Sequence, residues 1–581
     1  MNSTFEVISG LLGGLAIFLF GMNMMSDCLQ KAAGDKMRSI LALLTKNPVL
    51  GVLAGALTTA VLQSSSATTV MAIGFVSAGL MKLPQGISII LGANIGTTMT
   101  AQLLAFKIND YVSAIIFIGF IISFVMKSEK AKAIGQTIFA FGLLFLGIET
   151  MGDVMAPLAH SHVFTDMIAG VADIPVLGAA VGTLMTLIVQ SSSATIAVLQ
   201  NFASQPGPDG VTSIIGLTGA IPILLGDNIG TTITAVLASI GQSKDAKRTA
   251  LSHCIFNVSG FCLFIWFIGP FAKFIEWISP KGPEVEVISR QIANAHTAFN
   301  CIMTLIWLPL IWLLVKIVVK IIPEGTKERK LNYYGVKYLD NRLLGQPAAA
   351  LELVAKEVLH CGHIVQEMIR DLREAVKSDD RSYLDDVRRK ADGAAEVNRA
   401  IQNYLSDLFS GGILTEEQAS QTAGMLYVLG DIDRIGILTR SAANSMGDSS
   451  VKKFNYSEEA MKDLKISLKS IESIYSDTLK ILVSRNEEEA ESIRRRKDEV
   501  LDLDLDMRKA HLDRVSKGNC DASLTAPFSS ILHNIDRMSN SCANIADAAL
   551  GQVDFSYFIN IRKFWEEIKD DIDYTSAEGQ A

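Results

Sequence analysis

The chain has 581 residues with a formal net charge of −8, and it contains no Lys/Arg tract of the kind that grips a nucleic-acid backbone, which argues against a nucleic-acid partner. Its seven cysteines are scattered and form no CxxC pair, so neither a disulfide framework nor a cysteine metal site is expected. Long apolar runs dominate up to about residue 322, and polar, charged sequence follows from about residue 327. We therefore expect a membrane half followed by a water-soluble half.

The membrane half contains seven apolar stretches that we interpret as full spans, because about 20 apolar residues are needed to cross roughly 30 Å of hydrocarbon. In chain order they cover 7–27, 85–106, 111–126, 133–150, 212–240, 250–270 and 298–320. The first stretch follows no basic region and precedes no small-residue cleavage site, so we expect it to belong to the mature fold.

Two further apolar stretches, 50–80 and 176–203, are each interrupted by the same polar cluster, Gln-Ser-Ser-Ser. Non-helical polar backbone is tolerated at membrane depth only where it is buried in protein or lines a wet cavity. A re-entrant helical hairpin with the cluster at its tip meets this condition. The predicted hairpin tips are Gln63–Ser66 and Gln190–Ser193.

The distribution of Lys and Arg orients these spans. With the N-terminus outside, the inner segments hold most of the basic residues and the outer segments hold few. The inner residues are Lys31, Lys36, Arg38, Lys46, Lys82, Lys127, Lys130, Lys132, Lys244, Lys247 and Arg248, and the outer ones are Lys107, Lys273, Lys281 and Arg290. This pattern predicts a cytoplasmic C-terminal half, and it holds only if both hairpins are re-entrant.

An internal repeat relates the two hairpins. The segment from Val49 through the first Gln-Ser-Ser-Ser-Ala-Thr is echoed by the segment from Val176 through the second, and Gly92-Ala-Asn-Ile-Gly-Thr-Thr98 is echoed by Gly226-Asp-Asn-Ile-Gly-Thr-Thr232. We place repeat one at about 7–126, repeat two at about 133–270, and an extra span at 298–320. Three predicted crossings separate the two starting points, and this odd number inverts the second copy. Inverted repeats with broken helices are typical of secondary transporters.

The two tips have a chemistry suited to an oxyanion. Each combines a run of hydroxyls with the free N–H groups of a half-helix N-terminus, where the helix dipole adds roughly half a positive charge. Neither motif contains Lys or Arg, so bound sodium ions are the natural counter-charge, with hydroxyl, amide and backbone oxygens as ligands. The alternative is that these serines only pack against their own helices. Duplication in matched positions weakens that alternative.

The repeated Gly-x-Asn-Ile-Gly-Thr-Thr motifs fall in mid-span, where we expect the glycines to unwind the helix and expose side-chain oxygens. Asp227 has Ala93 as its counterpart, so it is either a cation ligand in one copy or a helix cap beside Gly226. His253 with Asn257, and His296 with Asn300, share a helix face at i, i+4, and interhelical hydrogen bonding is the favoured role over contact with an ion path. No nucleophile elbow, P-loop or zinc motif is present, so no enzyme is expected.

These paired motifs resemble those of the type II sodium-dependent phosphate cotransporters, including their bacterial members, over about residues 5–320. The resemblance implies a bacterial inner-membrane protein in a lipid bilayer that transports inorganic phosphate with sodium, by alternating access around a midplane site. The implied phosphate ligands are Gln63, Ser64, Ser65, Ser66, Gln190, Ser191, Ser192 and Ser193. The implied sodium ligands are Gln63, Thr68, Asn94, Thr98, Gln190, Thr195, Asn228 and Thr232, with Asp227 as a further candidate.

The C-terminal half has apolar residues at i, i+3, i+4, which predicts helices. Within it, Leu429-Gly-Asp-Ile-Asp-Arg434 is echoed by Leu532-His-Asn-Ile-Asp-Arg537. This half resembles a PhoU domain of two three-helix repeats. The resemblance implies a divalent or iron-type metal, with Asp431, Asp433 and Asp536 as ligands; Asn534 stands where the second motif would have aspartate, and a solvated charged face is an equal alternative.

The predicted fold is therefore all-α. It comprises a polytopic membrane domain over 1–325 with two inverted, hairpin-containing repeats, a linker over 326–345, a PhoU-like cytoplasmic helical domain over 346–560, and a tail over 561–581. The leading functional hypothesis is sodium-coupled phosphate transport regulated by the PhoU-like domain. The alternatives are a membrane phosphate sensor without net transport and a transporter of another oxyanion. A homodimer is compatible with the sequence, and the direction and stoichiometry of transport are not encoded in any motif.

Overall fold

The computed structural model describes residues 3–33, 47–106, 108–155, 174–207, 211–323, 334–412, 414–447, 456–551 and 556–560. Within these ranges the chain is helical, with only one isolated β-bridge between Pro206 and Ser213, so the all-α prediction is confirmed. The chain divides into two compact units, Met1–Thr326 and Lys327–Ala581. The predicted tail and the basic residues Lys36, Arg38, Lys46 and Lys107 lie outside the described residues.

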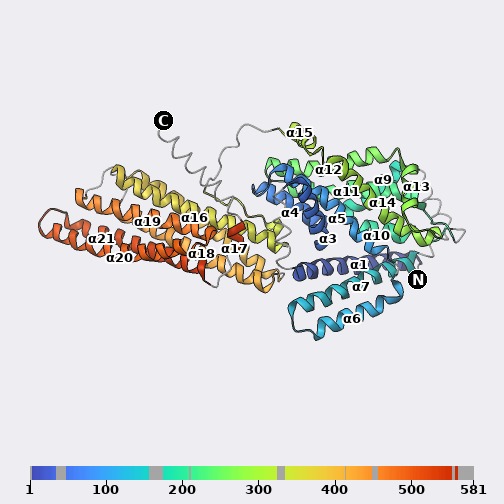
Figure 1. Ribbon diagram of the computed structural model, residues 1–581, viewed down its shortest axis with the longest axis horizontal. Coiled ribbons are helices and arrows are strands. Elements are labelled where there is room, and N and C mark those ends of the chain that lie inside the picture. The colour runs from blue at the N-terminus through green and yellow to red at the C-terminus, as the bar shows by residue number, and fades with distance from the viewer. Residues whose placement is uncertain are drawn as a thin grey trace. The chain divides into compact units, whose positions relative to one another are not determined.

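In the first unit, α1 (Ser3–Ala33) lies along α7 (Glu129–Met155), and α6 (Val112–Val125) packs against α7 (Figure 1). α6 has 14 residues, which rise about 21 Å. The helix follows the 3-10 turn η1 (Asn109–Tyr111) and ends at Met126, which has extended backbone. This helix lies where the span at 111–126 is expected, but its 14 residues are fewer than the about 20 needed to cross the hydrocarbon. The predicted inversion of the second copy depends on this short helix crossing the bilayer.

Both predicted hairpins are broken at the predicted place. α3 (Pro48–Leu62) is followed by α4 (Ser65–Ser77), and α9 (Pro175–Val189) by α10 (Ser192–Ala203). At each break the glutamine has left-handed backbone, with φ of 51° at Gln63 and 55° at Gln190, and the next serine is extended. Left-handed backbone is unfavourable for a residue with a Cβ atom, so each break is held by the packing around it.

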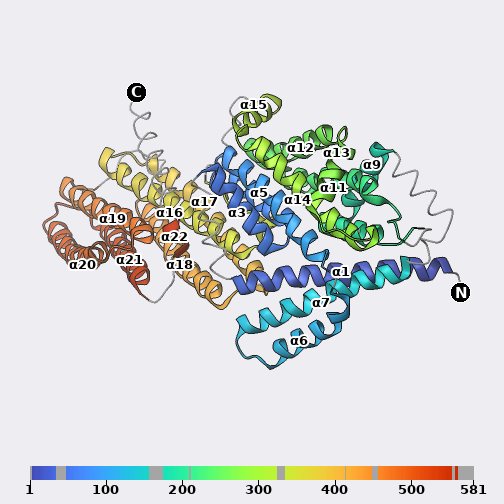
Figure 2. The same cartoon turned by 45° about the vertical axis from the view of Figure 1, so that its right-hand side comes forward.

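The helices that carry the Gly-x-Asn-Ile-Gly-Thr-Thr motifs, α5 (Leu83–Leu104) and α11 (Gly216–Ser239), are continuous through the motif. The expectation of unwinding at these glycines is therefore wrong. Their role is close packing: α3 lies along α5 and α9 along α11 (Figure 2). A Cβ atom at Gly92 would overlap the carbonyl oxygen of Val52, and one at Gly226 would overlap that of Ala179. These two contacts are equivalent under the sequence repeat.

Two expected straight spans are instead bent pairs of helices. α12 (Lys244–Phe264) turns by 95° into α13 (Ile268–Ile278), and α14 (Glu284–Trp307) turns by 82° into α15 (Ile311–Ile321). The single spans expected at 250–270 and 298–320 are therefore wrong. Pro309 lies in the break between α14 and α15, and Pro270 lies in the first turn of α13, and each lacks the N–H that one continuous helix would need there.

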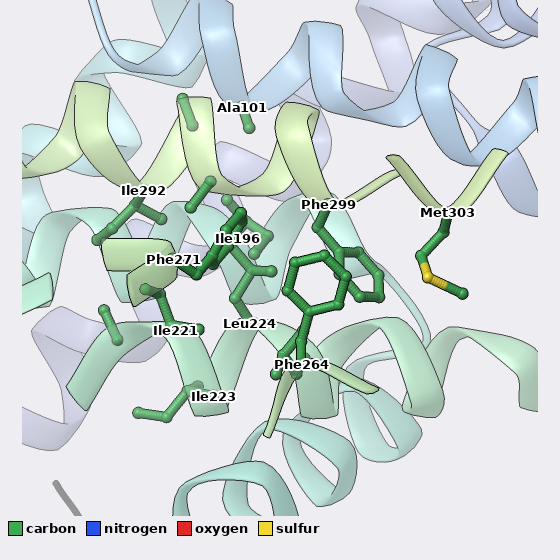
Figure 3. Close-up of a cluster of buried hydrophobic side chains, with 14 of the residues drawn as sticks. Ala101, Ile196, Ile221, Ile223, Leu224, Phe264, Phe271, Ile292, Phe299 and Met303 are labelled. Atoms are coloured by element: carbon green, nitrogen blue, oxygen red, sulfur yellow. The ribbon is translucent and has the colours of Figure 1, made fainter. Parts of the chain in front are cut away.

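The bends are duplicates of one another. The second helix of each pair begins at the same spacing after a histidine of the first helix, with Ile268 following His253 and Ile311 following His296. Figure 3 shows Phe264 at the end of α12 between Phe271 of α13 and Phe299 of α14. The ring centroids of Phe264 lie 4.8 Å from Phe271 and 5.1 Å from Phe299, both edge-to-face. This aromatic cluster lies in the core where the bent pairs meet α10 and α11.

Among the described residues of this unit, four helices are long and apolar enough to cross a membrane, and the two bent pairs raise this to as many as six. Exposed apolar side chains cover its helices, including Phe117 and Phe124 on α6. A surface of this kind is expected of a protein whose solvent is lipid.

The second unit is a helical bundle. Its helices are α16 (Pro347–Ser378), α17 (Tyr383–Ser410), α18 (Glu416–Ser445), α19 (Glu458–Ser484), α20 (Glu487–Ser516), α21 (Thr525–Leu550) and the short α22 (Ser556–Asn560). α16–α18 and α19–α21 form two triplets, and the first helix of each ends at a left-handed residue, Asp379 or Arg485. Residues 334–345, within the expected linker, pack on α16: the Glu357 carboxylate accepts the backbone N–H groups of Lys337, Tyr338 and Leu339.

Candidate functional site

Each broken hairpin is closed by a hydrogen bond between two threonine hydroxyls. Thr59 of α3 donates to Thr68 of α4 at 2.9 Å, and the hydroxyls of Thr186 of α9 and Thr195 of α10 lie 3.0 Å apart, within hydrogen-bond distance. All four side chains are buried. The two bridges occupy matched positions in the repeat, so the duplication extends from the sequence to the hydrogen bonds of the tips.

The serines after each break form a second matched feature. Ser64 caps α4 by accepting the N–H of Ala67 at 3.1 Å, and Ser191 caps α10 by accepting the N–H of Ala194 at 3.3 Å. The remaining first-turn N–H groups and the hydroxyls of the next serines are the donors that an anion would meet at a helix N-terminus. Of these serines, Ser65, Ser192 and Ser193 are buried and Ser66 is half-buried.

The two glutamines differ in their surroundings. The Gln63 side chain is buried, and its Oε1 accepts a hydrogen bond from Thr100 of α5 at 2.8 Å. Gln190 is exposed. In the described residues no hydrogen bond joins one Gln-Ser-Ser-Ser segment to the other. Each hairpin instead reaches the other copy through its second arm, because α4 contacts α11 and α10 contacts α5.

Asp227 gives the second copy a buried acid. It lies in the middle of α11, so the alternative role as a helix cap is wrong. Thr186 donates to its Oδ1 at 2.6 Å, whereas Oδ2 has no hydrogen-bond partner and the side chain is fully buried. An unpaired buried carboxylate oxygen is costly in a membrane-embedded site, and a bound cation or a proton removes that cost.

The two motif asparagines contact the bent pairs. His253 Nε2 of α12 lies 3.0 Å from Asn94 Oδ1 of α5, and Asn300 of α14 donates to Asn228 Oδ1 of α11 at 3.5 Å. One member of each His/Asn pair, His253 and Asn300, thus bonds to a neighbouring helix, whereas Asn257 donates to the carbonyl of His253 on its own helix. Asn94 Nδ2 has no partner in the described structure.

The other sodium candidates bond to their own helices. Thr98 donates to the carbonyl of Ile95 and Thr232 to that of Ile229, both at 2.8 Å. Thr68 and Thr195 have the same kind of bond to Ser64 and Ser191 in addition to their bridges. Local bonding of this type is ordinary for threonine in a helix. Thr68 and Thr195 therefore lie each at the tip of its own hairpin, whereas Thr98 and Thr232 lie on the motif helices α5 and α11.

Thr59, Thr186 and Thr100 contact the tips but were not among the predicted ligands. For Thr59 and Thr186 a signal existed, because both occupy the same register of the repeat, one helical turn before a Gln-Ser-Ser-Ser. Thr100 is also matched in the repeat, by Thr234, but the match does not extend to the bonding, since Thr234 donates to the carbonyl of Thr231.

The acidic residues expected to bind metal in the second unit are not gathered into a site. Asp431 and Asp433 are two residues apart on α18, and residues at this spacing project from different sides of a helix. Asp431 accepts from Asn544, while Asp536 lies near Asn540 on α21. Among the described residues, no group of three or more His, Cys, Asp or Glu side chains is placed to hold a metal ion.

Comparison with known proteins identifies both units. A family model described as Na+/Pi-cotransporter matches residues 17–153 and 155–303, across both hairpins. The chain belongs to the Na+/Pi-cotransporter family. The model of the PhoU domain matches residues 358–446 and 467–549, so the second unit of this family member is a PhoU domain.

Three relatives illustrate how far the similarity extends. "Uncharacterized protein YqeW" of Bacillus subtilis is 34% identical over 309 residues, 53% of this chain and 96% of its own length. "Putative inorganic phosphate export protein YjbB" of Salmonella typhimurium is 24% identical over 548 residues, 94% of this chain and 97% of its own. Human "Sodium-dependent phosphate transport protein 2B" is 40% identical over 97 residues, 16% of this chain and 13% of its own.

Proposed function

We propose that this Na+/Pi-cotransporter family member couples the movement of inorganic phosphate across the bacterial inner membrane to sodium, and that its PhoU domain regulates this transport from the cytoplasm. The observation that carries the proposal is the matched pair of broken hairpins, each closed by a threonine bridge, Thr59–Thr68 and Thr186–Thr195. Two equivalent polar breaks in apolar helices suit a site that must open to either side.

In this proposal phosphate binds to the hydroxyls and N–H groups at the start of α4 and α10, with Gln63 and Gln190 beside them. Sodium offsets its charge. Thr68, Thr195, Asn94, Asn228, Thr98 and Thr232 supply oxygens for sodium, and the unpaired Oδ2 of Asp227 supports a carboxylate ligand in the second copy. The two copies are inverted relative to the membrane, with the N-terminus outside. The names of the relatives support phosphate as the substrate, and one of them specifies export.

The deciding experiment is labelled phosphate transport in proteoliposomes, with a sodium gradient compared with an equal potassium gradient, in both gradient directions. We expect sodium-dependent phosphate movement in the wild type. Phosphate binding without sodium-dependent movement, in protein inserted in both orientations, would favour a phosphate sensor. Movement of sulfate as fast as phosphate would indicate a less selective oxyanion transporter.

A pair of double variants tests the tips. S65A/S192A removes one buried hydroxyl from each tip, and hydrogen bonds to a charged ligand contribute about 1.5–3 kcal/mol each. We expect phosphate affinity to fall at least about tenfold. S113A/S123A on α6 removes the same number of hydroxyls away from the tips and serves as the control. Equal phosphate affinity in all three proteins would rule out the tips as the binding site.

A further inference from the structure

A cavity of about 410 Å³ lies between the end of α11 and the start of α12, and Ile322, just after α15, also lines it. Its walls are apolar apart from the side chains of Ser239 and Lys247. The apolar side chains include those of Val236, Ile240, Ala250, Leu251 and Cys254. Lys247 is the one charged residue among the described residues that line the cavity, and the volume is within the range of about 300–1,000 Å³ found for small-molecule sites.

The charge lies at one end of this cavity. Lys247, Leu251 and Cys254 share one face of α12, because spacings of four and three residues repeat the helical turn. Lys247 and Cys254 are separated by about 10 Å along the helix axis. α11 is long and apolar enough to cross a membrane and ends at Ser239, so the turn into α12 lies near a membrane face. The cavity therefore has its cation at headgroup level and its apolar walls beside the hydrocarbon.

The apolar part of the cavity opens to the outside of the unit. Val236 and Ile240 line it and are both exposed, and Leu237 beside them is exposed as well. Val258, one helical turn after Cys254 on α12, is also exposed. In a membrane-embedded unit, apolar side chains on the surface face lipid. An occupant that fills this cavity therefore has a hydrocarbon part.

The membrane face beside the cavity carries more positive than negative charge. Lys247 and Lys320 are exposed, and neither takes part in an ion pair within the part of the chain that the structure describes. Asp245 is engaged by Arg248 at 2.6 Å. Arg248 Nε also donates to the carbonyl of Ile322 at 3.0 Å, which holds the end of α15 against α12. The uncompensated lysines favour an anionic headgroup.

α15 has the form of a helix that lies in a membrane interface. It follows the 82° bend after α14 and lies at the edge of the first unit beside α12 (Figures 1 and 2). One of its faces is buried and the other is exposed; the buried residues are Ile311, Leu314 and Val318, and the exposed ones are Trp312, Lys316 and Lys320. The Lys316 ammonium lies 4.9 Å from the ring centroid of Trp312. Tryptophan and lysine together are typical of the headgroup region.

The duplicate helix α13 gives the comparison for charge. α13 carries Lys273 and Glu276, whose charges cancel, whereas α15 carries Lys316 and Lys320 and no acidic residue. Two helices with the same place in the two bent pairs thus differ in net charge. Only the one next to the cavity suits an anionic membrane surface.

We infer that this cavity binds an anionic phospholipid, with the headgroup phosphate at Lys247 and an acyl chain along the groove between α11 and α12. Lys316 and Lys320 add the positive field that favours a headgroup with net negative charge over a zwitterionic one. Inorganic phosphate alone would leave the apolar walls unfilled, so a lipid is the source of the anion. This lipid site is separate from the hairpin tips and is independent of phosphate transport.

The test of the charged end is retention of labelled phosphatidylglycerol by the purified full chain in detergent, compared with phosphatidylethanolamine that has the same acyl chains. We expect the wild type to prefer phosphatidylglycerol at least about threefold. Lys247→Gln combined with Lys320→Gln should remove most of this preference. Lys273→Gln combined with Lys281→Gln removes two exposed lysines at or after α13 and should leave it unchanged. The preference should shrink as the salt concentration rises, because it is electrostatic.

A second pair of variants tests the apolar end. Val236→Trp fills the cavity from an exposed position and should lower retention of both lipids at least about threefold, while Leu237→Trp adds the same ring at a neighbouring exposed position that does not line the cavity. Equal losses in the two variants would overturn the lipid site, as would equal retention of both lipids by the wild type. Displacement of the labelled lipid by excess inorganic phosphate would show that the site binds a free anion, and would also overturn it.

Discussion

The hydroxyl of Thr186 lies 2.6 Å from a carboxylate oxygen of Asp227, whereas the equivalent threonine in the first copy, Thr59, has Ala93 at the position of the aspartate. The two hairpins therefore share one backbone arrangement and differ by one buried acid. A single carboxylate between two otherwise matched tips makes them unequal in charge, so we expect them to contribute unequally to cation binding.

Asp227→Asn tests this inequality, because it keeps an oxygen for Thr186 and removes the charge. We expect the sodium concentration for half-maximal phosphate transport to rise about tenfold, which corresponds to ~1.4 kcal/mol. Placing an acid in the first copy at Asn94 would not be a matched control, because Asn94 contacts His253 and Asn94→Asp would change that contact as well. Ala93→Asp is the matched reverse change in the first copy. An Asp227→Asn protein with wild-type sodium dependence would show that the acid has no part in coupling.

Gly226→Ala tests the packing of the second hairpin against α11. The new Cβ atom would overlap the carbonyl oxygen of Ala179, and backbone atoms in a helix cannot give way as a side chain can. We expect a loss of roughly 1–3 kcal/mol or more in stability, measured as thermal unfolding in detergent. Gly13→Ala on α1, where a Cβ atom meets nothing within 4 Å, should be neutral or slightly stabilising. Equal melting temperatures for the two variants would contradict the close approach.

Glu357 predicts a pH dependence in the second unit. Burial raises the pKa of this carboxyl to about 7, against the lowering effect of the N–H groups of Tyr338, Lys337 and Leu339. A carboxyl whose pKa is higher in the folded than in the unfolded state contributes stability that is fully present below its unfolded pKa of about 4.5 and is lost as the pH rises through about 7. The full shift corresponds to roughly 3 kcal/mol.

The measurement is the melting temperature of the second unit within the full chain between pH 5 and pH 8, compared with Glu357→Gln. We expect the wild type to lose stability relative to the variant as the pH rises, because glutamine does not titrate. The exposed Glu396→Gln on α17 should follow the wild type. Parallel curves for wild type and Glu357→Gln would show that Glu357 does not titrate in this range.

Separate compact units predict separable functions. A chain ended after residue 326 retains both hairpins, both motif helices and both bent pairs. We expect this shortened protein to move phosphate with the sodium dependence of the full chain, and to lose whatever control the PhoU domain exerts on rate. Correctly inserted protein with no transport would show that the PhoU domain is required for the transport step itself.

The hairpin breaks were predictable from sequence because Gln-Ser-Ser-Ser is a polar interruption inside apolar sequence, and the same interruption occurs twice in matched positions. The continuity of α5 and α11 was not predictable from sequence, because glycine permits both unwinding and close helix packing. Only the positions of the carbonyls of Val52 and Ala179 in the structure show that these glycines serve close packing. For the His/Asn pairs the expected interhelical bond is found at His253 and Asn300, and Asn257 bonds to its own helix instead.

The bent pairs escaped prediction for a different reason. Hydropathy measures the length of an apolar stretch and not its direction, so the sequence predicts one span at 298–320, across the end of α14 and α15, although Pro309 lies between the two helices. A cavity of about 580 Å³ in the first unit, lined by Asp110, Glu149 and Asp153 among other residues, was equally hidden from sequence reasoning. Glu149 and Asp153 are a recognisable i, i+4 pair, but Asp110, Gln200 and Ser289 come from other parts of the chain, and only folding places them around one space.

The glycine contacts also constrain how the first unit can move. At Gly92 and Gly226 one helix backbone rests directly on another, with no side chain between them that could change rotamer to let the surfaces slide. We therefore expect α3 with α5, and α9 with α11, each to move as a rigid pair of helices. In the proposed transport, a movement that opens the site would therefore displace one of these helix pairs as a whole rather than slide α3 along α5 or α9 along α11.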